Sequence, residues 1–379
     1  MISPFERQVL RRLLKIAAAH AHETRPNPPA VAAVITNDTE ITIARHHGPG
    51  TSHAEVAALA AAGPKAKGAT LIVTLEPCTH WGANPPCTKA IIASGIRRVI
   101  FPIADPNPLV SAHPATTQLI EAGIEVESGI LQREAAIANA EFLTHVSLNR
   151  PYITAKVAAS LDGKTALSTG ESKYISGKIA LRFVHQLRSR CDAIMVGIGT
   201  VLADDPQLDI RTEVQSPLPF RKIILDTHAR TPLTSRLFSN TSKENIVIVV
   251  SNTAPHARVS ALSEIATVLA IPSPSLRHQW AMILPQLHQL GIYRILLEGG
   301  TAVMSNAIDS GIVDQLIVIH SPILIGGDSP FSVYSGSGAT RLSTAPALFH
   351  PTYQRAGRDM ITNGYLNDPL TLIRSSIHS

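Results

Sequence analysis

The first half of the chain alternates short apolar runs with stretches of helical spacing. Residues 30–36 (AVAAVIT), 69–75 (ATLIVTL) and 97–103 (RRVIFPI) are apolar over strand lengths and predict buried strands. The stretch 53–63 (HAEVAALAAAG) has helical spacing and ends at a glycine that a proline follows. Strands separated by helices predict an α/β fold with a sheet sandwiched between helices.

Three further segments complete this half. Residues 1–23 predict an amphipathic helix, because charged side chains interrupt their apolar run. Residues 114–130 predict a helix, a glycine stop and a strand. Residues 133–148 predict one helix that links the two halves of the chain.

The second half repeats the alternation from about residue 149 onward, with a helix expected at 177–189. Strands are expected at 193–198, 221–226, 245–250, 294–300 and 316–325. The domains predicted from this pattern are 1–147 and 148–367, followed by a loose C-terminal tail at 368–379.

Composition narrows the class of protein. Of the 379 residues, 45% are hydrophobic and 16% charged, which is enough apolar material for packed cores. The N-terminal stretch does not resemble a signal peptide, and no apolar run has the length of about 18 residues that a membrane span needs. The three cysteines are sparse and odd in number, which favours a reducing compartment, so we expect a cytoplasmic protein.

The net charge of +5 raises the possibility of a nucleic-acid-binding surface. The basic residues are scattered, however, and aromatic residues make up only 4% of the chain. A mild positive field also suits a small phosphorylated substrate, and we expect neither nucleic acid nor membrane as a partner.

Residues 75–87 (LEPCTHWGANPPC) hold two cysteines nine positions apart, which could form a disulfide, be buried thiols or bind a metal. His53 starts a predicted helix, and Cys78 is expected where another helix begins. One histidine and two cysteines can supply three ligands of a tetrahedral zinc, with the fourth position left for water. Glu55 is close enough in sequence to His53 to shuttle protons without being a ligand.

This H-x-E and P-C pattern is typical of zinc-dependent nucleobase deaminases, although their second cysteine usually follows after two residues and here follows after eight. We therefore predict a catalytic zinc held by His53, Cys78 and Cys87, with Glu55 as the proton carrier.

The second half is less informative by its residues alone. The stretch VGIGTVLADDP has Leu202 where the Rossmann fingerprint needs its third glycine. Asp204 and Asp205 follow in a loop, where they could simply cap and turn the chain. The stretch LLEGGTAVMSNAI predicts a strand, two glycines and a helix whose amino end can hold a phosphate.

Several motifs together resemble the bifunctional riboflavin biosynthesis family, in which a pyrimidine deaminase is fused to a pyrimidine reductase. In the first half they are RPNPPAVAAVI, HAEV, TLEPCTHWGANPPC, SGIRRVIFPIADPNPLV and AGIEVESGIL. In the second half they are ITAKVAASLDGKTA, GESKYIS, LRSRCDAIMVGIGTVLADDPQLDIR, ILDTHAR and LLEGGTAV. They follow the family's order over nearly the whole chain. The resemblance implies an N-terminal cytidine-deaminase-like three-layer domain and a C-terminal dihydrofolate-reductase-like domain.

In the deaminase half, the resemblance gives the zinc ligands and Glu55 the roles proposed above. Asn27 resembles the family asparagine that lines the base pocket, and His46 and His80 resemble histidines near the substrate phosphate. The implied reaction is hydrolytic removal of an exocyclic amine from a phosphorylated pyrimidine.

The reductase half is implied to use NADPH to convert a ribosylamino group into a ribityl chain, and to form homo-oligomers. The positions that match cofactor contacts are Lys156, Ala158, Tyr174, Thr200, Asp204, Thr227, Gly300, Thr301, Ala302, Val303, Met304, Ser305 and Asn306. The positions that match the substrate site are Ser172, Arg188, Leu208, Arg211 and Glu298. The two arginines suit a phosphate, because a guanidinium binds it with two parallel hydrogen bonds.

The chain departs from the family pattern at several positions. Ala83 stands where the family usually has lysine or arginine, and Asn84 where it has threonine. Val31, Ala112 and Pro114 replace glycines of two loops. A lost phosphate-facing cation could cost about 1.5–3 kcal/mol of charge-assisted hydrogen bonding.

In the reductase half, Asp209 replaces a common threonine, and we expect it to weaken the phosphate contact of Arg211 only if its carboxylate points inward. Tyr174 stands where tryptophan is usual and Ser176 where threonine is usual. The leading hypothesis is a two-step enzyme. The alternatives are an enzyme in which only the reductase half is efficient, and a basic zinc-containing nucleic-acid-binding protein.

Overall fold

The computed structural model describes residues 1–172, 175–211 and 219–375. The chain divides into two compact units, the first made of Met1–Asn149 and the segment from Pro369 onward, the second of Arg150–Asp368. Among the described residues, no helix has both the length and the apolar character to cross a membrane.

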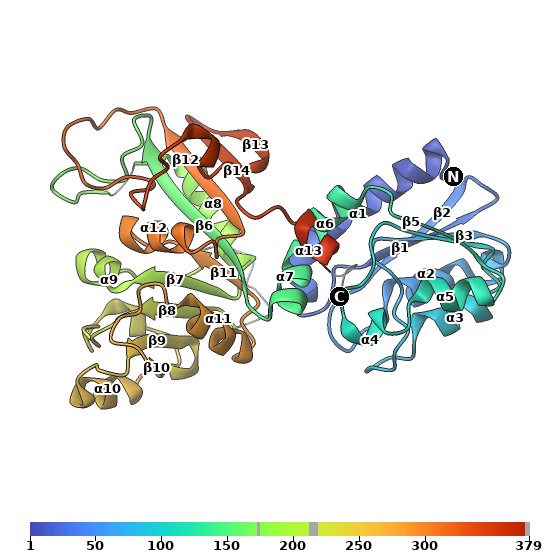
Figure 1. The fold of residues 1–379 in the computed structure, drawn as a ribbon, viewed down its shortest axis with the longest axis horizontal. Coiled ribbons are helices and arrows are strands. Elements are labelled where there is room, and N and C mark those ends of the chain that lie inside the picture. Colours follow the sequence, from blue (N-terminus) through green and yellow to red (C-terminus); the bar gives the residue numbers. More distant parts are fainter. Residues whose placement is uncertain (173–174, 212–218, 376–379) are drawn as a thin grey trace. The chain divides into compact units, whose positions relative to one another are not determined.

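The first unit is built on a five-stranded sheet (Figure 1). Its strands are β1 (Val31–Thr36), β2 (Glu40–Arg45), β3 (Thr70–Val73), β4 (Arg98–Phe101) and β5 (Glu125–Ser128). They lie in the order β2-β1-β3-β4-β5, with β1 antiparallel to both neighbours and β3, β4 and β5 parallel. The predicted strands are confirmed, and β2 is an addition.

Helices cover both faces of this sheet, which gives the three layers expected from the sequence. One face carries α1 (Pro4–Thr24), α6 (Gln132–Ala138), α7 (Ala140–Leu148) and α13 (Leu370–Ser375), and the other α2 (Ala54–Ala62), α3 (Cys87–Ala93) and α5 (Ala115–Glu121). Short turns of helix, η1 (Gly63–Ala66) and α4 (Pro108–Ser111), complete the unit. Strand β1 is buried on both sides, because Ala32 and Val34 face α2 while Ala33 and Ile35 face α1.

Two expectations for this unit were wrong. The single helix expected at 133–148 is two helices, because Asn139 interrupts it; this asparagine is fully buried and donates from Nδ2 to the carbonyl of Ala135. The expected tail contains helix α13, which packs against α6 and α7 and buries Ile373.

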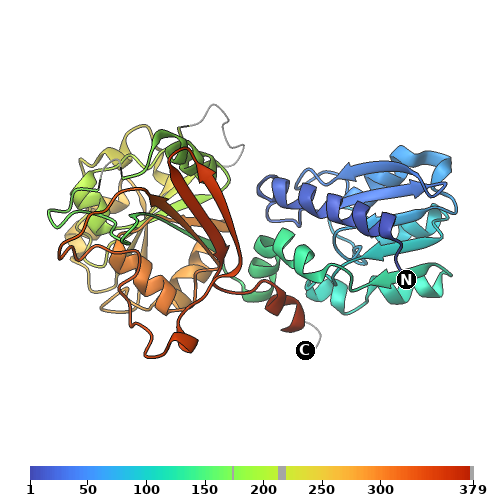
Figure 2. The same cartoon turned by 90° about the horizontal axis from the view of Figure 1, so that it is seen from above.

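The second unit is built on a nine-stranded sheet, seen from above in Figure 2. Its strands are β6 (Tyr152–Ser160), β7 (Ala193–Gly197), β8 (Arg221–Leu225), β9 (Ile246–Ser251), β10 (Thr267–Ile271), β11 (Arg294–Leu297), β12 (Gln315–Ser321), β13 (Phe349–Ala356) and β14 (Asp359–Tyr365). The order is β10-β9-β8-β7-β11-β6-β12-β14-β13, parallel from β10 to β12 and antiparallel beyond.

Helices also flank this sheet on two faces. One face carries α8 (Lys178–Ser189), α9 (Ile198–Asp204) and α10 (His256–Ser263), the other α11 (Trp280–Gln289) and α12 (Thr301–Asp309). The short helices η2 (Arg236–Phe238), η3 (Lys243–Asn245) and η4 (Leu342–Thr344) lie in connections. Strand β11 inserts between β6 and β7, so the chain reverses its winding there, and ligands of parallel sheets bind at such points beyond the carboxyl ends of the strands.

Candidate functional site

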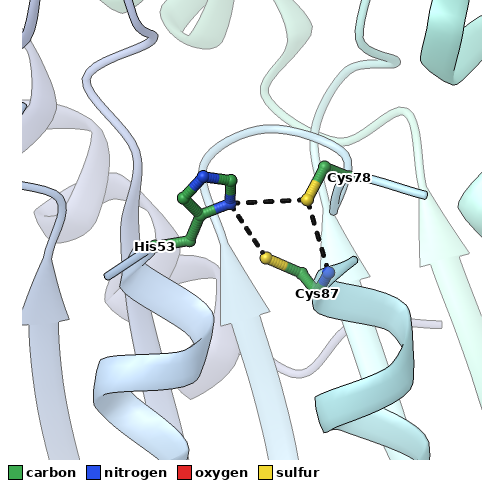
Figure 3. A group of neighbouring side chains, drawn as sticks. All are labelled: His53, Cys78 and Cys87. Carbon is green, nitrogen blue, oxygen red and sulfur yellow. Dashed lines mark hydrogen bonds between the residues drawn. The ribbon is translucent and has the colours of Figure 1, made fainter. Parts of the chain in front are cut away.

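The three predicted zinc ligands lie together in the first unit. His53 immediately precedes α2, Cys78 lies in the loop after β3, and Cys87 is the first residue of α3. The Nδ1 atom of His53 is 3.1 Å from the Sγ of Cys87 and 3.4 Å from the Sγ of Cys78 (Figure 3). The expectation that a helix begins at Cys78 was wrong, because the polypeptide runs on to Cys87 before the helix starts.

The three ligand atoms lie within 4.8 Å of one another. A tetrahedral zinc with bonds of about 2.0–2.3 Å would hold such atoms about 3.5 Å apart, so the donor set and its spacing fit this ion. Both cysteines are thiols, not partners in a disulfide. The hydrogen bond from Cys87 lowers the pKa of Cys78, which favours the thiolate that a metal requires.

Glu55 lies in the first turn of α2, two residues after the histidine ligand, and its side chain is buried. Burial, with a further contribution from the negative charge of Cys78, raises the pKa of Glu55 to about 7. A carboxyl group whose pKa lies near the working pH can both accept and return a proton.

A cavity of about 280 Å³ opens beside these side chains, and Asn27, His46 and His80 all line it. The Nδ1 of His46 lies 3.1 Å from the carbonyl oxygen of Ser52, which can only accept, so Nδ1 carries the proton. Burial lowers the pKa of His46, which keeps the ring neutral, and its Nε2 therefore accepts from the Nδ2 of Asn27 at 3.0 Å. His46 thus fixes the orientation of the Asn27 amide, while His80 approaches the cavity from the cysteine loop.

Sequence reasoning missed the polar and aromatic side chains of Glu76, Asp105, Asn107 and Phe142, which line the same cavity. Glu76 accepts hydrogen bonds from the backbone N–H of Asp105 at 3.2 Å and of Ala115 at 2.8 Å, so it ties the cysteine loop to the loop after β4. Burial raises the pKa of Asp105 to about 7, with a smaller contribution from Glu76. The motifs EPC and ADPNP were visible in the sequence, but nothing local showed that they meet.

The departures from the family pattern fall in different places. Ala83 and Asn84 line the cavity, and Asn84 donates from Nδ2 to the carbonyl of Thr51 at 2.9 Å. Val31 starts β1 in the core, while Ala112 and Pro114 flank short helices outside the lining. None of the described residues that line the cavity is a lysine or arginine, so the substitution at position 83 is the one that changes the charge of this lining.

In the second unit, three of the predicted residues form a buried ion triad. The carboxylate of Glu298, just after β11, contacts the Nζ of Lys156 at 2.8 Å and receives two hydrogen bonds from Arg188, at 2.7 and 3.1 Å. Burial alone would raise the pKa of Glu298, but the two cations lower it to about 2. The guanidinium of Arg188 therefore binds a carboxylate of the chain itself. From the sequence we expected it to bind a phosphate and did not predict this partner.

The loop after α9 holds the other two substrate positions. Leu208 is buried with a positive φ of 57°, and the side chain of Arg211 is exposed and donates to the side-chain oxygen of Gln207 at 3.1 Å. The carboxylate of Asp209 contacts the Nζ of Lys222 at 3.0 Å. Lys222 thus offsets the negative charge of Asp209, two positions before Arg211. Ser172 is half-buried before the helix α8, and Tyr174 lies outside the described residues.

The residues expected to contact the cofactor come from several different elements of the second unit. Lys156 and Ala158 lie on β6, Thr200 on α9, Asp204 at its exposed end, and Thr227 after β8. At the amino end of α12, the nearest described atom to a Cβ built on Gly300 would be the Oγ1 of Thr200, at 4.0 Å. The first backbone N–H groups of a helix have no partner within it, so this open end fits a phosphate of NADPH.

Not all of the run 300–306 can reach such a phosphate. The Thr301 hydroxyl donates to the carbonyl of Ser332, and Met304 is packed in the core. Asn306 accepts from the indole N–H of Trp280 at 2.9 Å. Ala302 and Ser305 lie within the helix. The side chain of Val303 packs against Gly197, because a Cβ added to that glycine would lie 2.7 Å from it. The backbone of the first turn, more than the side chains, is available to a ligand.

Models of known protein families match both halves of the chain. The model of the RibD C-terminal domain matches residues 151–349, and that of the cytidine and deoxycytidylate deaminase zinc-binding region matches residues 5–103. The riboflavin biosynthesis protein RibD of Aquifex aeolicus is 38% identical over 86% of this chain and 89% of its own, and that of Escherichia coli is 35% identical over 93% and 96%.

Solved structures agree with these relatives. Acinetobacter baumannii RibD (form 1) is 31% identical, with a TM-score of 0.80 over 95% of this chain and 98% of that chain. A diaminohydroxyphosphoribosylaminopyrimidine deaminase/5-amino-6-(5-phosphoribosylamino)uracil reductase from Thermotoga maritima is 29% identical, with a TM-score of 0.79 over the same shares.

The fold and the zinc-ligand cluster, taken with these matches, define a zinc-dependent deaminase joined to an NADPH-dependent reductase. More specifically, the chain belongs to the RibD family of bifunctional enzymes of riboflavin biosynthesis. The predicted fold class, the paired activities and the two cofactors are confirmed, and the match over both halves does not favour the alternative in which only the reductase works.

Proposed function

We propose that the first unit removes the exocyclic amine of a phosphorylated diamino-ribosylamino-pyrimidinone by hydrolysis, and that the second reduces the ribosyl group of the product to a ribityl chain. The proposal rests on one observation. His53, Cys78 and Cys87 lie together at a cavity that the side chain of Glu55 also lines.

In the deaminase step, zinc bound by His53, Cys78 and Cys87 would supply a water of lowered pKa. Glu55 would accept the proton of that water and return it to the departing ammonia, since burial raises the pKa of its carboxyl to about 7. Asn27, oriented by His46, would bind the polar edge of the base, and His80 would lie toward the phosphate.

In the reductase step, NADPH would supply a hydride to the anomeric carbon of the protonated open-chain imine, which gives the amine that carries the ribityl chain and leaves NADP⁺. The amino end of α12 at Gly300 would hold a cofactor phosphate, with Thr200 beside it. Arg211 would bind the substrate phosphate, since its guanidinium is exposed and its neighbour Asp209 is neutralised by Lys222.

The remaining cofactor and substrate positions are proposed on the family resemblance, with Lys156, Arg188 and Glu298 contributing as a pre-formed charged triad.

The test is to follow ammonia release and NADPH oxidation separately, with the phosphorylated diaminopyrimidine as substrate. The proposal expects ammonia release without NADPH and NADPH oxidation only after it. NADPH oxidation with no ammonia release would leave the reductase half alone active, and ammonia release with no oxidation would contradict the reductase assignment.

We also propose that the protein is cytoplasmic and forms homo-oligomers through its reductase unit. Strand β13 is the edge of the nine-stranded sheet, and Phe349 and Tyr353 on it and Met360 on β14 are exposed hydrophobic side chains. Light scattering after size-exclusion chromatography tests the oligomer. Tyr353→Lys should shift it toward the monomer, and a wild-type monomer at micromolar concentration would contradict the proposal.

A further inference from the structure

A polar stripe runs along one side of α12. Thr301, Ser305 and Asp309 are four residues apart, so they lie one above another on the helix surface. All three are bonded to the segment 329–337, which we call the strap and which follows β12 in the chain (Figure 1). At the amino end of the helix, the Thr301 hydroxyl donates to the carbonyl of Ser332 at 3.0 Å. One turn further, the backbone N–H of Ser335 donates to the hydroxyl of Ser305 at 2.9 Å.

Asp309, at the last position of α12, binds the strap through its carboxylate. Its carboxylate accepts from the Tyr334 hydroxyl at 2.6 Å and from the backbone N–H of Ser337 at 3.0 Å. A Cβ on Gly336 would lie 2.5 Å from both the Asp309 carboxylate and the Tyr334 ring, so a larger residue there would displace the two side chains that join the strap to the helix. A negative charge at the carboxyl end of a helix is locally unfavourable, which indicates that Asp309 is placed there for its contacts with the strap.

The other side of the strap is bonded to the loop that follows β6. The backbone N–H of Thr165 donates to the carbonyl of Phe331 at 3.0 Å, and that of Val333 donates to the carbonyl of Gly163 at 3.1 Å. The Nζ of Lys164 donates to the carbonyl of Ser329 at 2.9 Å. The strap therefore joins two segments that are more than a hundred residues apart in the chain, the loop after β6 and helix α12.

We propose that the strap positions the cofactor site, by holding the amino end of α12 in a fixed place relative to the loop after β6. The inference rests on the proposed function, because it takes the first turn of α12 at Gly300 as the place where NADPH binds a phosphate. Backbone N–H groups bind an anion well only when they are held in place beforehand, and a helix released from the strap populates the binding-competent arrangement for a smaller fraction of the time. Tyr334 and Asp309 act as positioning residues, with no contact to the cofactor required of them.

The experiment measures the Kd of NADPH by fluorescence titration of the full-length protein, without the pyrimidine substrate. Tyr334→Phe removes one hydrogen bond to Asp309 with little change of shape, and Asp309→Asn removes the charge. Each should raise the Kd about three- to tenfold by lowering the competent fraction. Asp328→Asn is the matched control, since it makes the same change on an exposed carboxylate just before the strap and should leave the Kd unchanged.

The outcomes separate this inference from the function on which it rests. If Gly300→Val weakens NADPH binding but Tyr334→Phe and Asp309→Asn do not, the cofactor site stands and the positioning role of the strap is wrong. If the two strap variants lower the melting temperature and leave the Kd unchanged, the strap is only structural, and the inference also fails. If Gly300→Val itself leaves the Kd unchanged, the cofactor is not bound at α12 and both proposals fall.

Discussion

Glu298→Gln would keep the shape of the side chain and remove the negative charge between Lys156 and Arg188. The side chain of Glu298 is 9% exposed, and those of Lys156 and Arg188 are 13% and 17% exposed. Water can therefore solvate the two cations only poorly once the carboxylate is removed. A pKa lowered from 4.5 to about 2 corresponds to about 3 kcal/mol of stabilisation of the charged carboxylate at pH 7. The free energy of unfolding of the reductase unit should therefore fall by about 3 kcal/mol, which matches the cost of breaking a buried ion pair from one side.

The pH dependence follows from the direction of the shift. A carboxylate with a lowered pKa in the folded state stabilises fully above its unfolded pKa of 4.5, and the stabilisation is lost as the pH falls through about 2. The difference between wild type and Glu298→Gln should shrink from about 3 kcal/mol at pH 7 to about 1 kcal/mol at pH 3.

Tryptophan fluorescence in urea can report this unit separately. The chain has two tryptophans, of which Trp280 is buried in the core of the reductase unit and Trp81 is 67% exposed in the deaminase unit. The buried indole should change its emission on unfolding while the exposed one changes little, and Trp81→Phe removes the background from both proteins under comparison. An unchanged urea midpoint at pH 7, or a difference that grows toward pH 3, would refute the assignment of Glu298 as the charged centre of the triad.

Three further predictions concern the two substrate sites. Ala83→Lys should lower the deaminase KM about tenfold, because it supplies a cation to a cavity whose lining has no lysine or arginine; an unchanged KM would mean that another group binds the phosphate. Arg211→Ala should raise the reductase KM about tenfold and leave the NADPH Kd unchanged, and a loss of NADPH affinity instead would show that Arg211 belongs to the cofactor site. Asp209→Asn should raise the reductase KM several-fold by loosening the loop that Lys222 anchors, and steady-state kinetics showing a lower KM would revive the idea that the Asp209 charge opposes the phosphate.

The zinc ligands could be predicted from the sequence because the residue types that bind zinc are few and their motif is local on each side. His53 and Glu55 share one helix start, and the two cysteines lie nine positions apart at the ends of one loop. The side chains around them were harder to foresee, since the loop after β4 reaches the cavity only through the parallel pairing of β3 with β4.

The reductase site was less predictable because its side chains form hydrogen bonds and ion pairs with residues far away in the chain. Arg188 looked like a phosphate ligand, yet its guanidinium is bound by Glu298, 110 positions later. The helix expected at 133–148 shows the same limit, because the buried amide of Asn139 breaks a pattern whose spacing is otherwise helical.

The most direct test of the central claim is the rate of ammonia release per bound zinc in Glu55→Gln. The change removes the proton carrier and keeps all three ligands, so the protein should retain its zinc and release ammonia about 10²–10⁴ times more slowly, while its oxidation of NADPH with deaminated substrate stays at the wild-type rate. Ammonia release at the wild-type rate from zinc-loaded Glu55→Gln would contradict the account of the deaminase site.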